Sequence, residues 1–242
     1  MSKRIANHER LPCTIQEEVA TRHARRVMER LACQFNVKQY SDVEFRVEHD
    51  GQEPAEPIYA SRMLLSATND YFKAMFESAF RESEPGPIVI RGVDHATFVT
   101  CLRFCYSGQA EIDGSNLMRV LHGSDMFQIE DLFDSCCERM IGLVDRHCCV
   151  ASLSVATRFQ GRDGARRLQD ACLLCVTSCL ADFVADDWAG LSSLEPTVLD
   201  QVCVAIGHGL ANFVSPVKAL EAAFDAIRRW GVTRKYVPVN GT

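Results

Sequence analysis

The sequence lacks a long apolar run. Its longest uncharged stretch, near residues 202–217, is interrupted by Gly207, Gly209 and Pro216. Because a membrane-spanning helix needs about 20 mostly apolar residues, we expect no membrane partner. The first 13 residues also lack the apolar centre of a signal peptide, so we expect a cytoplasmic or nuclear protein.

Motifs for catalysis and cofactor binding are missing as well. The sequence has no glycine-rich phosphate loop, no Gly-x-Ser-x-Gly turn and no His-Glu-x-x-His pair. Its seven histidines are scattered, without the spacing of metal ligands. We therefore predict that the protein is not an enzyme and that it has no cofactor and no metal site.

Positive charge is scarce in the middle of the chain. The net charge is −6 overall, about +4 over residues 1–40, about −10 over residues 41–146 and near zero afterwards. An acidic region of this kind argues against nucleic-acid binding, which needs clustered lysine and arginine. It suits partner proteins that have basic or mixed surfaces.

Cysteine, in contrast, is abundant, with 12 residues. Cys172, Cys175 and Cys179 share one helical stripe with Leu168, which allows two interpretations. One is a metal or redox site, but the segment holds no histidine and zinc sites usually draw four ligands from two separated pairs. We favour the other, in which the thiols pack in a core as small apolar groups.

An amphipathic helix is predicted over residues 14–35. Thr14 and Glu17 have the spacing of a capping box, and an apolar stripe follows that contains Ala20, Ala24, Val27, Met28, Leu31 and Phe35. The stripe fits two roles about equally well. The helix either packs on its own domain or forms a dimer interface.

The rest of the chain predicts an α+β half followed by a helical half. Alternating residues predict strands at 42–47, 57–60 and 88–90, and a further short strand at 110–113. Asn69 and Asp94 are expected to cap helices, and Gly108 to end one. Further helices are predicted near residues 61–67, 69–80, 94–107, 116–127, 130–144, 151–159, 164–183, 194–206 and 216–230, with Leu143 among the buried residues.

Several strings in this order resemble a BTB (POZ) domain followed by a BACK domain, as in kelch-type adaptors. Residues 40–45, 60–65, 71–76 and 104–108 are similar to the spaced BTB signatures, and residues 145–149 and 223–230 to the BACK pattern. The resemblance implies a BTB fold, in which a small β-sheet flanks a helix cluster, and then an all-helical BACK domain. The implied division is an N-terminal segment (1–21), a BTB domain with its dimerisation helix (22–146), a BACK domain (147–231) and a loose tail (232–242).

The resemblance also implies partners and residues. Such proteins are adaptors that homodimerise, and many recruit cullin-3 to a ubiquitin ligase. Phe80 and Glu82 occupy the family's cullin-binding motif. Asp42 and Arg62 fall in its charged pocket near the dimer cleft, so the dimer-interface candidates are Ala24, Val27, Met28, Leu31, Asp42 and Arg62. Two alternatives remain, an assembly module that binds no cullin and a thiol redox sensor, and the protein target is unknown.

Overall fold

The computed structural model describes residues 14–48, 56–77 and 86–179, and further along residues 197, 198, 200–202 and 204. The chain divides into two compact units, Met1–Leu132 and Phe133–Thr242. Within the described ranges, no helix has both the length and the apolar character needed to cross a bilayer. The predicted helix over 216–230 lies outside the described residues.

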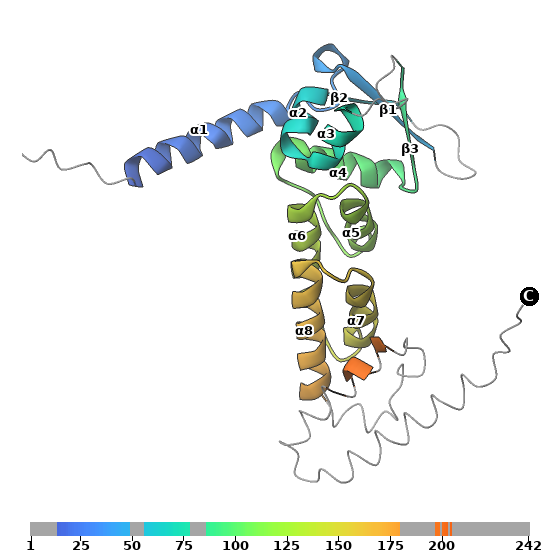
Figure 1. The fold of residues 1–242 in the computed structure, drawn as a ribbon. Coiled ribbons are helices and arrows are strands. Elements are labelled where there is room, and N and C mark those ends of the chain that lie inside the picture. The colour runs from blue at the N-terminus through green and yellow to red at the C-terminus, as the bar shows by residue number, and fades with distance from the viewer. Residues whose placement is uncertain are drawn as a thin grey trace, which may run out of the picture. The chain divides into compact units, whose positions relative to one another are not determined.

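A three-stranded sheet forms part of the first unit (Figure 1). The central strand β1 (Val43–Glu48) pairs antiparallel with β2 (Ile58–Ala60) and parallel with β3 (Ile88–Arg91). The predicted alternation is confirmed, since Val43, Phe45 and Val47 are buried. Two parallel strands can be joined only by a long crossover connection. Between β1 and β3 this connection contains β2 and two helices, α2 (Arg62–Thr68) and α3 (Asp70–Glu77).

The core of this unit is a cluster of aromatic rings. The Phe45 ring lies 5.3 Å from Phe98, and the Phe98 ring lies 5.0 Å from Phe127. Phe72 stacks on Phe127 at 5.8 Å. These four side chains are fully buried, and they come from β1, α3, α4 (His95–Ser107) and the residue after α5 (Leu117–Met126). The cluster therefore holds the sheet and three helices together.

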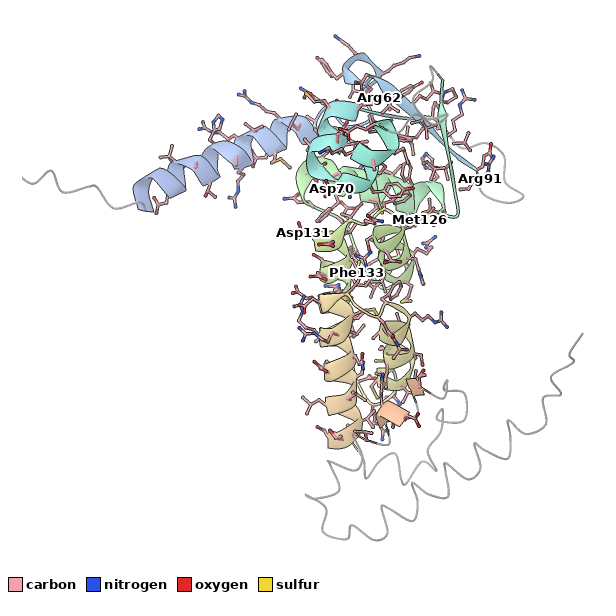
Figure 2. All side chains as sticks on the ribbon, viewed as in Figure 1. Arg62, Asp70, Arg91, Met126, Asp131 and Phe133 are labelled. Atoms are coloured by element: carbon pink, nitrogen blue, oxygen red, sulfur yellow. The ribbon has the colours of Figure 1, made fainter. Side chains whose placement is uncertain are left out.

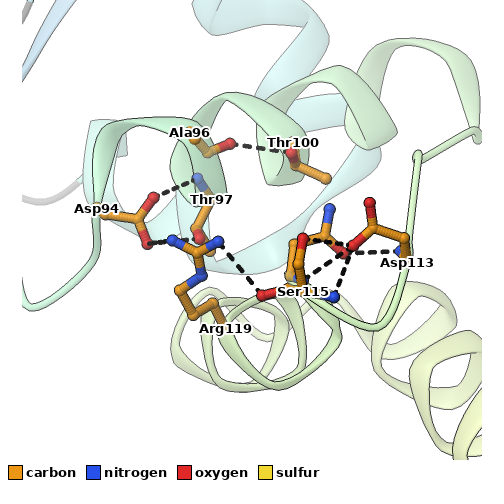
Figure 3. Close-up of polar contacts among 8 residues, drawn as sticks. Asp94, Ala96, Thr97, Thr100, Asp113, Ser115 and Arg119 are labelled. Atoms are coloured by element: carbon orange, nitrogen blue, oxygen red, sulfur yellow. Dashed lines mark hydrogen bonds and ion pairs between the residues drawn. The ribbon is translucent and has the colours of Figure 1, made fainter.

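Both ends of α4 follow the prediction, and Figure 3 shows the contacts of Asp94 at its start. The Asp94 carboxylate accepts the backbone N–H of Thr97 at 3.0 Å and the Thr97 hydroxyl at 2.7 Å. Gly108 ends the helix with a φ of 66°, a left-handed conformation that glycine adopts without strain. Asn69 likewise caps α3, because its Oδ1 accepts the N–H of Phe72 at 3.0 Å.

The strand predicted at 110–113 is wrong, since these residues form an irregular segment that leads into a turn. Side-chain hydrogen bonds take the place of strand pairing there. The Asp113 N–H donates to Asn116 Oδ1 at 2.9 Å, and Asn116 Nδ2 donates to the Glu111 carbonyl at 2.9 Å. A local turn motif has therefore overridden the alternating pattern.

The helix α1 (Thr14–Ala32) ends earlier than predicted, and a short 3₁₀ helix, η1 (Lys38–Tyr40), follows it. Phe35 lies beyond the end of α1, with its ring edge-on to Tyr106 at 5.2 Å. Asn36 next to it has a φ of 58°. Its Oδ1 accepts the N–H of Tyr59 at 2.8 Å, which fixes the turn against β2.

The second unit is helical in its described part. It holds most of α6 (Glu130–Ile141), together with α7 (Cys149–Arg158) and α8 (Asp163–Ser178). The Phe133 and Phe159 rings lie 5.2 Å apart, and Arg167 Nη1 lies 2.9 Å from Glu138 Oε1. The prediction that Leu143 is buried is wrong. Because α6 ends at Ile141, Leu143 falls in a turn and is exposed.

Candidate functional site

The beginning of α2 brings together two predicted site residues. The Asp42 carboxylate accepts the backbone N–H of Arg62 at 2.6 Å, so Asp42 acts as a remote cap for the helix. The Arg62 guanidinium lies over the Phe76 ring, 4.9 Å from its centre. Asp42 is exposed and Arg62 half-buried, so the contact between them is an exposed cap and not a buried charge pair.

Tyr106 completes this cap from inside the unit. Its hydroxyl oxygen accepts the N–H of Ser61 at 2.7 Å, one residue before α2 begins. Burial raises the pKa of Tyr106, and the nearby Asp42 carboxylate adds to the rise. Two backbone N–H groups at the start of α2, which have no partner within the helix, thus donate to Tyr106 of α4 and to Asp42, the residue before β1. Arg62 is labelled at this end of α2 in Figure 2.

The predicted dimer stripe on α1 is open to solvent over much of its length. Ala24 is exposed, 40% of Val27 is exposed, and Met28 and Leu31 are half-buried. The helix packs against α4, and Figure 1 shows the remainder of α1 extending away from the helix cluster of its own unit. An apolar stripe left uncovered in this way is a candidate interaction surface.

Two exposed apolar side chains were missed by the sequence reasoning. Met63, the second residue of α2, is 77% exposed, and Val19 on α1 is 57% exposed. In the run Met63-Leu64-Leu65 the two leucines are buried, and Met63 points the other way. The helical period could have separated Met63 from the leucines, but a seven-residue helix offers too few positions to fix its inward face.

The predicted cullin-binding residues Phe80 and Glu82 lie outside the described residues. The helix that precedes them, α3, is anchored at its start by a side-chain amide. Asn69 at its start is buried, and its Nδ2 donates to the carbonyls of Phe127 at 3.1 Å and Gln128 at 3.3 Å. This amide therefore links the start of α3 to the turn after α5.

The cysteine stripe is buried only in part. Cys172 and Leu168 are buried, as the core interpretation predicts, whereas Cys175 and Cys179 are half-buried. Burial raises the pKa of Cys172 and of Cys175 to about 12, so both are thiols at neutral pH. Among the residues that the structure describes, no group of three His, Cys, Asp or Glu side chains is arranged to hold a metal ion.

Comparison with known proteins finds a family match for part of the chain. The BTB/POZ domain family matches residues 31–142. The human Kelch repeat and BTB domain-containing protein 7 is 27% identical over 141 residues, which cover 57% of this chain and 21% of that protein. The human Kelch-like protein 38 is 29% identical over 173 residues, which cover 64% of this chain and 29% of that protein. The chain thus spans between a fifth and a third of the length of these relatives.

Proposed function

Because residues 31–142 are a BTB/POZ domain, we propose that this protein is a non-catalytic, homodimeric adaptor that recruits cullin-3 to a protein target. The observation that carries the proposal is the family match together with relatives named for Kelch and BTB domains. The adaptor acts in the cytoplasm or the nucleus. It binds neither nucleic acid nor membrane, and its target is still to be identified.

The second half of the chain is proposed to be a BACK domain over residues 147–231, with a loose tail at 232–242. Its described helices α7 and α8 pack on each other, which agrees with an all-helical domain. The N-terminal segment 1–21 and the BTB domain over 22–146 complete the proposed division. The two compact units divide slightly earlier, between Leu132 and Phe133. Asp134 and Glu138, which follow this division, pair with Arg167 on α8.

The dimer is supported by the open stripe on α1. In a two-fold dimer the same apolar patch is buried on both chains, so one amphipathic helix supplies both halves of the interface. The stripe residues Ala24, Val27, Met28 and Leu31 are exposed or half-buried within their own unit. Asp42, Arg62 and the exposed Met63 are proposed to continue this interface onto α2.

Cullin binding is proposed for Phe80 and Glu82, which follow α3 in the chain. A large apolar residue that enters a hollow supplies most of the affinity, and a carboxylate beside it fixes the orientation. The Asn69 amide would give α3 a rigid base for this motif, because it ties the helix start to two backbone carbonyls.

The test is a calorimetric titration of the N-terminal region of cullin-3 with the full chain and three variants. We expect Phe80→Ala to weaken binding by about 30-fold, a loss of about 2 kcal/mol, and Glu82→Ala to weaken it less. Glu77→Ala is the matched control, since Glu77 is an exposed carboxylate on α3 outside the motif. It should bind like the wild type.

The outcomes separate two functions. Micromolar binding that both motif variants weaken supports the adaptor. A folded wild-type dimer that gives no heat with cullin-3 overturns it and favours the second candidate, an assembly module that regulates partners by dimerising. The open α1 stripe supports dimerisation, which both candidates share, and it does not involve Phe80 or Glu82.

A further inference from the structure

The side of α1 that faces away from the apolar stripe carries a row of arginines. Arg22, Arg26 and Arg30 follow one another at intervals of four residues, so their side chains project along one side of the helix. Because successive residues of a helix are rotated by about 100°, Arg22 lies about 180° from Leu31 of the stripe. All three arginines are exposed. A dimer that buries the apolar stripe therefore leaves most of this arginine row in solvent.

The arginine row is not neutralised by its own chain. Among the residues that the structure describes, no carboxylate forms an ion pair with the row, although Glu18 and Glu29 border it on the same helix. In the same unit, Arg46, Arg91 and Arg119 each pair with a carboxylate. Figure 1 shows α1 extending away from the helix cluster, so the acidic groups on that cluster lie away from the row.

An exposed apolar side chain lies within this surface. Val19 is three residues before Arg22 and seven before Arg26, two spacings that place it on the same side of the helix. Its exposed fraction is 57%, the largest on α1 among the large apolar residues described. The surface therefore offers three guanidinium groups for charge pairing and one apolar contact.

We propose that the arginine row and Val19 bind a short acidic peptide segment of a partner protein. A guanidinium group can form two parallel hydrogen bonds with one carboxylate, a geometry suited to Asp and Glu side chains. From Arg22 to Arg30 the row is about 12 Å long, which equals the length of about four residues of extended peptide. This binding goes beyond the proposed adaptor function, since it requires neither cullin-3 nor a dimer.

The charge of the rest of the first unit favours a short peptide over a larger polyanion. A nucleic acid or an anionic membrane surface extends well beyond 12 Å, the approximate length of the row. It would therefore also approach residues 41–146, whose net charge of about −10 repels it. A peptide segment of a few residues can contact α1 alone and avoids this repulsion.

The test is fluorescence anisotropy of the full chain with a fluorescein-labelled peptide of about eight residues, made of glutamate with one central leucine. We expect saturable binding that weakens as the ionic strength rises from about 0.05 to about 0.3 M. Arg22→Glu combined with Arg26→Glu should weaken binding by at least about tenfold, because like charges then face each other. Glu29→Gln should strengthen it by about twofold, since it removes a carboxylate that repels the peptide.

The matched control is Arg139→Glu combined with Arg158→Glu. Both arginines are exposed, and they lie on α6 and α7, so the net charge changes by the same amount away from α1. This variant should bind the peptide like the wild type. Circular dichroism must show that each variant keeps its helix content, which is expected because arginine and glutamate have similar helix propensities.

The proposal is overturned if the wild type shows no saturable binding at low ionic strength, or if the control variant weakens binding as much as the α1 variant. Tighter binding of single-stranded DNA or of phosphatidylserine vesicles than of the peptide also contradicts it. Light scattering of the same samples tests the proposed function separately. A monomer that binds the peptide contradicts the homodimer alone, and a dimer that does not bind it contradicts this inference alone.

Discussion

The side chain of Asp94 stabilises the first unit because it contacts both α4 and α5. Its carboxylate accepts both the N–H and the hydroxyl of Thr97, and Arg119 Nη1 lies 3.9 Å away on α5. Burial alone would raise the pKa of Asp94, but these hydrogen bonds and the arginine charge outweigh it, and the pKa is lowered. The ionised carboxylate is therefore the form that the fold prefers.

We predict that Asp94→Ala lowers the free energy of unfolding by about 1 kcal/mol at pH 7, as for other lost helix caps. A group whose pKa is depressed by folding contributes stability above its unfolded pKa, and that stability is lost as the pH falls through the folded value. The difference between variant and wild type should thus shrink below about pH 4. Urea denaturation at several pH values measures it, and Glu111→Ala is an exposed control. A difference that does not change with pH would contradict the assignment.

Among the helices, two glycines allow a neighbouring helix to pack closely. A Cβ added at Gly123 on α5 would lie 2.8 Å from Thr97 Cγ2 and 3.1 Å from Cys101 Sγ, both on α4. Thr97 is buried and is held by Asp94, so it has little room to move. At Gly164, a Cβ would overlap Asp134, so α8 can lie this close to α6 only with glycine there. Both glycines permit contacts between helices.

The helix α1 shows the opposite situation, because the apolar side chains on one of its faces are only partly buried by other residues of the first unit. We predict that replacing Val27 and Leu31 together by Asp converts the proposed dimer into a monomer, because two charges from each chain would be buried in the proposed two-fold interface. Light scattering should then give a mass near 27.0 kDa in place of twice that value.

The control for this change is Val89→Asp. Val89 has the same 40% exposure as Val27, but it lies on β3 and not on the stripe. It should leave the dimer intact, and circular dichroism must show that each variant keeps its helix content. A double variant that is folded and still dimeric would exclude α1 as the interface.

At the scale of the whole molecule, the first half of the chain holds a complete core. The buried rings Phe45, Phe72, Phe98 and Phe127 contact one another within residues 45–127. We therefore predict that a fragment of residues 1–146 folds on its own and unfolds in one cooperative thermal transition, followed by circular dichroism.

A shorter fragment of residues 1–112 is the matched comparison, because it lacks Phe127. The loss of this ring removes the stacking on Phe72 and the contact with Phe98, and it leaves the Asn69 amide without its two carbonyl acceptors. We expect no cooperative transition. If the longer fragment also melts without cooperativity, the domain boundary at residue 146 is wrong.

The features that could be predicted from the sequence alone are local. Alternation placed Val43, Phe45 and Val47 on the buried face of β1, and single residues marked the ends of helices at Asn69, Asp94 and Gly108. Such signals depend on hydrogen bonds within three or four residues or on the repeat of a helix or strand, so they can be read without knowing the fold. The family resemblance rests on the same kind of short, spaced strings.

Contacts between groups that lie far apart in the chain could be identified only from the folded structure. Tyr106 and Asp42 accept the N–H groups at the start of α2 from 45 and 20 residues away in the chain. Met63 is exposed because Leu64 and Leu65 occupy the core. Such contacts depend on how helices are oriented, and that orientation is set by the packing of the entire core, to which each short segment contributes only a part.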